Sequence, residues 1–152
     1  MARLVGLTIL GAAIGFMLRL ACGTYAVGIA PSRWMLLCSF MLTLFLGFAK
    51  RRAEIAVRSE GARSVLQDYS AQLLDALVAI TACASLLAYG LYTVDPEVAA
   101  LHGTDHLIAT LPIVTFGVFR YLYLLYREGA GQEPGRDLLA DGQIRLAVLA
   151  WA

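Results

Sequence analysis

Residues 50–68 read KRRAEIAVRSEGARSVLQD, and this basic segment separates two long apolar stretches of the chain. It holds five of the twelve lysine and arginine residues of the protein, namely Lys50, Arg51, Arg52, Arg58 and Arg63. Guanidinium groups pair well with phosphate oxygens. A cluster of this kind at the mouth of a helix bundle predicts a binding site for a phosphorylated ligand, with these five side chains as the phosphate-binding cations.

The composition of the chain is typical of an integral membrane protein. Of its 152 residues, 60% are hydrophobic and 15% are charged, whereas a soluble domain has about 25% charged residues. The mean hydropathy is +0.72. Several apolar runs approach the roughly 20 residues that cross a bilayer as a helix. We therefore predict an all-α, multi-pass transmembrane bundle rather than a soluble domain, and we expect no nucleic-acid partner. The net charge of +1 says little, because the charges are segregated along the chain.

The apolar pattern predicts five helical segments and one long basic loop. The predicted helices cover residues 4–29, 32–49, 71–93, 106–126 and 144–152, and the loop covers 50–70. The last segment would rise only about 14 Å, which is half the thickness of a bilayer. We therefore expect the chain to end inside a membrane helix.

The distribution of basic residues predicts how the bundle is oriented in a cell membrane. Arg3, the basic loop and the segment 127–145 should be cytoplasmic, because cytoplasmic loops are enriched in lysine and arginine. The connection 94–105 has neither residue type and should lie outside, and Arg33 in the other outer turn is the exception.

The first apolar segment carries an arginine within its hydrophobic run. Gly11, Gly15, Arg19 and Gly23 recur every four residues and therefore share one helical face. Glycines allow a neighbouring helix to approach closely. A charge inside a membrane needs a polar partner, so Arg19 either pairs with a neighbour's carboxylate or carbonyl groups or lines a polar cavity.

Several charged residues near the basic loop also have interpretations that need no ligand. Arg51, Glu54 and Arg58 fall on one helical face if the helix continues past the membrane, and they could form a salt-bridged, solvated turn. Asp75 is predicted to lie in the first turn of its helix, where the helix dipole favours an acid.

An aromatic stripe marks the fourth apolar segment. Phe116, Phe119, Tyr123 and Tyr126 share one face of the predicted helix. An interfacial aromatic belt, with Arg120 extending to the membrane surface, explains this pattern without a functional role.

The residue types that hold transition metals are present without a metal-binding pattern. Cys22, Cys38 and Cys83 all lie inside apolar runs and are expected to be buried hydrophobic residues. His102 and His106 are four positions apart, but no further ligand accompanies them, so we do not predict a zinc site.

Four stretches of the sequence resemble one known family. They are GFMLRLACGTYAVGIAPSRWMLLCSFMLTLFLGFAKRRAEI at 15–55, QDYSAQLLDALVAITA at 67–82, FRYLYL at 119–124 and DLLADGQIRLAVLAW at 137–151. Together they are similar to the second half of UbiA-superfamily membrane transferases. Within that superfamily the chain looks most like the bacterial decaprenyl-phosphate phosphoribosyltransferases, in the same segment order.

The resemblance implies a bundle of nine membrane helices around a lipid-accessible cavity. The five segments here would be helices five to nine, so residues 1–152 would form the C-terminal part of such a domain. In this family two polar motifs bind diphosphate through Mg²⁺, and the first, of the type Asn-Asp-x-x-Asp, does not occur in this sequence. The second would be the basic loop, where Lys50-Arg51-Arg52-x-Glu54 replaces the aspartate-rich motif of aromatic prenyltransferases.

The resemblance also assigns roles to individual residues. Lys50 and Arg51 would hold phosphates, and Glu54 would be a polar or Mg²⁺-linked acid of the same loop. Tyr69 and Asp75 match a Tyr-Ser-x-x-x-Leu-Asp pattern and would border the site. Glu54 alone cannot supply the three or four oxygen ligands of a Mg²⁺ site, so the metal site is incomplete in this chain.

Three further residues match family patterns near the cavity. Arg19 matches a Gly-Phe-x-x-Arg pattern and would face the cavity. Arg120 and Tyr121 match a Phe-Arg-Tyr pattern, which is compatible with structural support and with substrate contact. No catalytic residue can be named from the sequence.

The function implied by the resemblance is a transfer reaction at the membrane surface. The expected reaction moves 5-phosphoribose from phosphoribosyl diphosphate to a polyprenyl phosphate, with Mg²⁺ as cofactor and a missing N-terminal half as a possible partner. The alternatives are polyprenyl transfer to an aromatic acceptor such as 4-hydroxybenzoate, and a non-catalytic membrane remnant or subunit. A small transporter has no support, because the five segments show no paired inverted repeat.

Overall fold

The computed structural model describes residues 2–26, 28, 32–59, 71–104, 106–127, 136 and 139–151. Every regular element within these residues is a helix. Among the described residues, four helical stretches are long and apolar enough to cross a membrane, namely Leu7–Ala26, Arg33–Ile55, Ala71–Thr93 and His106–Arg127. The predicted all-α, multi-pass bundle is thereby confirmed.

The helices follow one another in the order expected from the apolar segments. They are α1 (Ala2–Ala26), α2 (Arg33–Ser59), α3 (Ala71–Thr93), α4 (Pro96–His102), the 3-10 helix η1 (His106–Thr110), α5 (Leu111–Arg127) and α7 (Gly142–Trp151). The bounds of α3 coincide with the expected segment 71–93. Because α7 has 10 residues, it rises about 15 Å and is too short to cross a bilayer by itself.

Two stretches expected to be loops are partly helical. α2 continues to Ser59, so residues 50–59 of the expected loop extend the helix beyond its apolar part. The connection after α3 contains α4, which begins at the N-cap Asp95, whose side chain accepts hydrogen bonds from the backbone of Glu97 and Val98. α4 ends at Gly103, where φ is 64° and favours glycine.

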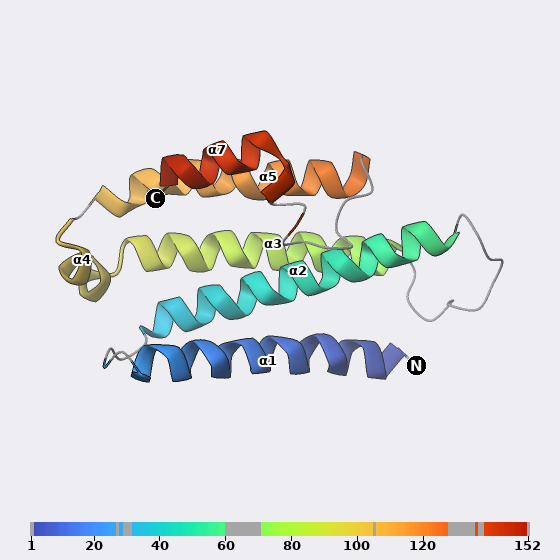
Figure 1. Cartoon of the computed structure of the whole chain (residues 1–152), viewed down its shortest axis with the longest axis horizontal. Coiled ribbons are helices and arrows are strands. Elements are labelled where there is room, and N and C mark those ends of the chain that lie inside the picture. The colour runs from blue at the N-terminus through green and yellow to red at the C-terminus, as the bar shows by residue number, and fades with distance from the viewer. Residues whose placement is uncertain are drawn as a thin grey trace.

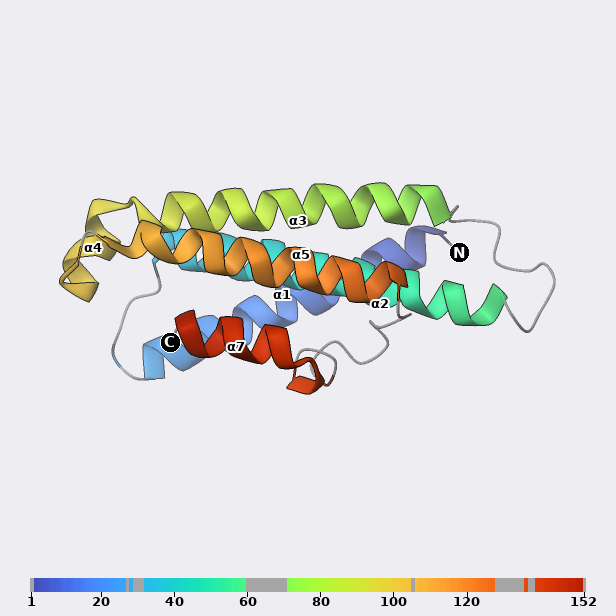
Figure 2. The same ribbon diagram turned by 90° about the horizontal axis from the view of Figure 1, so that it is seen from above.

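The long helices run side by side, with successive helices in opposite directions (Figures 1 and 2). α2 lies at the centre and packs against α1 on one side and α3 on the other, while α7 packs on α5. The N-terminus of α1, the end of α2 and the end of α5 lie at one end of the bundle, which we call the basic end. α4 lies at the opposite end (Figure 1).

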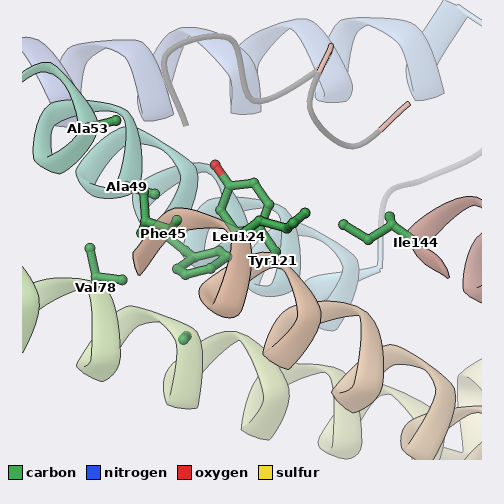
Figure 3. Packing of buried hydrophobic residues seen from close by; sticks show 9 residues of the cluster. Phe45, Ala49, Ala53, Val78, Tyr121, Leu124 and Ile144 are labelled. Carbon is green, nitrogen blue, oxygen red and sulfur yellow. The ribbon is translucent and has the colours of Figure 1, made fainter. Parts of the chain in front are cut away.

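The core lies where α2, α3, α5 and α7 meet. Its buried members are Phe45, Ala49, Ala53, Val78, Ala82, Tyr121, Leu124, Leu125 and Ile144 (Figure 3). The rings of Phe45 and Tyr121 meet edge to face, with their centroids 5.5 Å apart. The alanines of α2 and α3 allow the backbones of the two helices to approach closely, as small residues do in membrane bundles.

Much of the remaining apolar surface faces outward. On α3, Ile80 and Leu87 are 63% and 70% exposed, and on α5 Phe116 and Phe119 are 50% and 60% exposed. The predicted aromatic stripe is therefore an outward-facing surface of α5. Such surfaces are costly in water but suit contact with lipid chains.

Candidate functional site

Three adjacent cations on α2 point in different directions at the basic end. Consecutive residues of an α-helix are rotated by about 100°, so Lys50, Arg51 and Arg52 do not share one face. Their surroundings differ accordingly, and each has a different set of contacts.

Arg52 connects three helices. Its Nε lies 2.6 Å from Oδ1 of Asp75 on α3, and its guanidinium carbon lies 5.9 Å from the ring centroid of Tyr126 on α5. Tyr126 in turn lies close enough to Asp75 to interact with its carboxylate. Arg52 therefore holds α2, α3 and α5 together through charge and cation–π attraction.

The position of Asp75 differs from the expectation. The first turn of α3 contains no acidic residue, so the prediction that Asp75 lies in the first turn and interacts there with the helix dipole is wrong. Its carboxylate is occupied by the guanidinium of Arg52 from the neighbouring helix.

Arg51 forms a pair within its own helix. Its Nη1 lies 2.8 Å from Oε2 of Glu54, three positions later. Both side chains remain partly exposed, at 22% and 34%. The predicted salt-bridged turn is present between these two residues, and Arg51 retains further N–H groups for another acceptor.

Lys50 is the exposed cation of the three. It has no ion pair or hydrogen bond with any residue that the structure describes. Lys50, Arg51 and Glu54 stand at the rim of an open groove of about 550 Å³ between α1 and α2. Lys50 is thus available to an anion approaching from this groove.

Three residues of the predicted site have side chains outside the described part of the structure. Arg63 and Tyr69 are not among the described residues. The backbone of Arg58 belongs to α2, but its side chain lies outside the described part. Their predicted phosphate-binding and site-border roles stay predictions.

Arg120 on α5 pairs with Asp141, an acid that was not among the predicted site residues. Its Nη2 lies 2.8 Å from Oδ2 of Asp141, and its guanidinium carbon lies 5.2 Å from the ring centroid of Tyr123. The expectation that Arg120 extends to the membrane surface stays a prediction, because this pair does not place the side chain relative to a bilayer. The signal that could have identified Asp141 is a carboxylate three residues before the predicted fifth helix, close to where an N-cap is expected.

Asp141 also begins α7. Its Oδ1 accepts hydrogen bonds from the backbone N–H groups of Gln143 and Ile144, at 3.0 and 2.9 Å. The hydrogen bond from Arg120, assisted by these backbone donors, holds the pKa of Asp141 below its ordinary value of 3.8. One carboxylate thus caps α7 and attaches it to α5.

Tyr121 and Arg19 have contrasting environments. Tyr121 is only 1% exposed and belongs to the core, which favours structural support over substrate contact. Arg19 is exposed on α1 and has no polar partner within the described residues. A Cβ added at Gly11, Gly15 or Gly23 would meet nothing within 4 Å, so no described residue covers this face of α1.

The chain has curated relatives that share one name. Proteins from Corynebacterium glutamicum, Mycolicibacterium smegmatis and Mycobacterium tuberculosis are 33%, 29% and 30% identical to it over 144, 147 and 139 residues. Each alignment covers 90% of this chain and 42%, 46% and 45% of the respective relative. All three are named decaprenyl-phosphate phosphoribosyltransferase.

The chain is homologous to part of these UbiA-superfamily transferases. The resemblance inferred from the sequence is thereby confirmed. The chain spans less than half the length of the curated relatives that it matches. No model of a known protein family matches it.

The Mg²⁺ implied by this homology does not fit the residues seen here. The described residues contain no group of three or more His, Cys, Asp or Glu side chains that could hold a metal ion. Near the basic end, Glu54 is paired with Arg51 and Asp75 with Arg52. Both carboxylates therefore have cationic partners in place of the several oxygen ligands that Mg²⁺ shares.

Proposed function

We propose that this chain is part of a membrane transferase that moves 5-phosphoribose from phosphoribosyl diphosphate to a polyprenyl phosphate. In this proposal, residues 1–152 correspond to the C-terminal part of the transferase domain. The observation that carries the proposal is the exposed Lys50 at the basic end of a bundle homologous to decaprenyl-phosphate phosphoribosyltransferases.

The chemistry divides between water and membrane. Transfer breaks the bond between the ribose C1 and the diphosphate and joins C1 to an oxygen of the lipid phosphate. Both substrates bring phosphate charge to the membrane surface, and the departing diphosphate keeps its negative charge. Cationic side chains that are already in position stabilise such charge. Lys50 and the free N–H groups of Arg51 supply this function at the basic end.

Arg52 has a supporting role in this proposal. Its contact with Asp75 fixes α2 against α3, and Lys50 lies only two residues earlier on the same helix. A fixed α2 holds Lys50 and Arg51 at one depth relative to the apolar part of the bundle. Positioning of this kind matters, because small displacements of binding groups reduce transfer rates strongly.

A transfer assay tests the proposal. Membranes containing this chain together with the unmatched part of the Corynebacterium glutamicum relative would receive ribose-labelled phosphoribosyl diphosphate and decaprenyl phosphate. We expect label in the lipid fraction, and a Lys50→Ala, Arg51→Ala double variant should reduce it at least about a hundredfold if two charge-assisted contacts are lost. Equal transfer by the variant, at equal amounts of inserted protein, would contradict the phosphate role.

A second candidate function is a non-catalytic membrane subunit. It is favoured by one observation, that the acids near the basic end are paired with arginines and form no metal-binding group among the described residues. A subunit of this kind would insert and bind its partner but would add nothing to the partner's transfer rate. The same assay with and without the chain separates the two candidates.

A further inference from the structure

The groove between α1 and α2 is lined by both apolar and charged side chains, and a role in phosphate transfer alone does not account for the apolar ones. Its volume is about 550 Å³, and its lining includes Lys50, Arg51 and Glu54 of the basic end. Six of the residues that line it are Thr8, Ile9, Ala12, Leu46, Gly47 and Lys50.

The groove results from the way the two helices cross. A Cβ at Gly47 would lie 2.8 Å from Cγ2 of Ile9, so the glycine allows α1 and α2 to touch at this point. From this contact the two helices separate towards the N-terminus of α1 (Figure 1). The space beside the contact is the groove.

The walls of the groove are apolar and its rim is cationic. Ile9, Ala12 and Leu46 form apolar walls, and they lie within the candidate membrane spans Leu7–Ala26 and Arg33–Ile55. At the rim, Lys50 and Arg51 face one carboxylate, that of Glu54, which Arg51 already neutralises. The rim therefore keeps one excess positive charge, which Lys50 carries.

We propose that this groove binds the phosphate group of a membrane lipid, with Lys50 on the phosphate and the lipid chain along Ile9, Ala12 and Leu46. The inference rests on the proposed function and deepens it, because it gives the lipid-phosphate substrate a place in the bundle, beside Lys50 and between α1 and α2. A soluble phosphate would leave the apolar walls uncovered, whereas the chain of a lipid lies at the depth of these walls and packs against them.

Native mass spectrometry of the 152-residue chain, released from detergent micelles, tests lipid binding directly. The probes are a polyprenyl phosphate, the matching polyprenol and inorganic phosphate. We expect the chain to retain the polyprenyl phosphate at least about tenfold more tightly than the polyprenol, since one charge-assisted contact is worth that factor or more. Lys50→Gln should remove this preference.

Two further variants distinguish the site from general attraction. Ala12→Leu keeps every charge and fills the apolar wall, so it should weaken retention of the polyprenyl phosphate. Arg127→Gln removes an exposed cation at the same end of the bundle, outside the groove, and should bind as the unchanged chain does. An equal loss in Arg127→Gln would overturn the inference in favour of unspecific charge attraction.

Two further results of the mass spectrometry would overturn the inference. Displacement of the lipid by inorganic phosphate, with Ala12→Leu behaving as the unchanged chain, would overturn the inference in favour of a soluble phosphate ligand. Equal retention of polyprenol would overturn the role of Lys50. The measurement contains no phosphoribosyl diphosphate, so it tests lipid binding independently of transfer. Lipid binding without transfer would contradict the proposed function alone. Transfer without lipid binding in this groove would contradict this inference alone.

Discussion

Adjacent residues of the same type have different roles in this protein because the helix rotates them onto different neighbours. Arg52 faces α3 and pairs with Asp75, Arg51 pairs along its own helix with Glu54, and Lys50 faces the groove beside α1. A cluster that reads as one basic patch in the sequence is therefore divided into a structural pair, a local pair and one available cation.

The Arg52–Asp75 pair should contribute measurably to stability. Both side chains are partly exposed, at 23% and 36%, so solvent screening limits the contribution to about 1 kcal/mol. We expect Arg52→Ala and Asp75→Asn each to lower the free energy of unfolding by about this amount, and the double variant to cost no more than either one. Unfolding in mixed micelles, followed by circular dichroism, measures the three values.

The local pair provides the control for that measurement. Arg51→Ala removes an i, i+3 contact of about 0.2–0.5 kcal/mol and should have a smaller effect. Strictly additive losses in the Arg52 and Asp75 variants would show that the two side chains do not interact in the membrane-embedded protein.

At the scale of helices, a pair of buried aromatic rings is one of the contacts that join α2 to α5. Phe45 and Tyr121 are each 1% exposed, whereas Phe119 on the outer surface of α5 is 60% exposed. Phe45→Ala should lower the free energy of unfolding by about 3–5 kcal/mol through lost contacts and a cavity. Phe119→Ala should cost less than about 1 kcal/mol, because lipid replaces the lost contact, and similar losses at both positions would mean that α2 and α5 do not pack in this way.

The attachment of α7 to α5 should depend on pH. Because the folded protein lowers the pKa of Asp141, the stabilisation is complete above the ordinary value of 3.8 and is lost as the pH falls through the lower, folded value. Trp151 lies at the other end of α7, where its Nε1 donates a hydrogen bond to the hydroxyl of Tyr89 on α3 at 2.7 Å, so its emission reports on movement of α7 away from the bundle.

Tryptophan fluorescence measures this transition. Because the chain has two tryptophans, the Trp34→Phe background leaves Trp151 as the only reporter. We expect its emission to change on acidification below about pH 4 and to be independent of pH over that range in an Asp141→Asn variant, in which α7 is already loosened. A transition that persists unchanged in Asp141→Asn would assign it to another carboxylate.

At the scale of the whole molecule, exposed cations gather at one end of the bundle, and Arg33 beside Asp95 at the other end is an exception. The basic end carries Lys50, Arg51 and Arg127, and the opposite end carries α4 with Asp95 and Glu97. The positive-inside rule then predicts that the basic end is cytoplasmic.

Labelling of single cysteines tests this orientation. In a background without Cys22, Cys38 and Cys83, a membrane-impermeant maleimide should label Glu97→Cys in intact cells and Arg127→Cys only after lysis. Both positions are exposed, so a difference in labelling between them would reflect the side of the membrane and not burial. The reverse pattern would place the basic end outside and remove the phosphoribosyl diphosphate of the cytoplasm as a donor.

The sequence by itself determined the class of the protein, the order of its helices, the place of its basic cluster and the homology to membrane transferases. Composition and periodicity carry the class and the helix order, because membrane insertion and helix formation depend on neighbouring residues. The homology was inferred from the four stretches that resemble the family. The 3.6-residue period could not predict that Arg52 meets Asp75 across 23 positions or that Arg120 meets Asp141 across 21. Those pairs, and the groove that leaves Lys50 available, depend on how the helices are rotated and crossed, which only the tertiary packing decides.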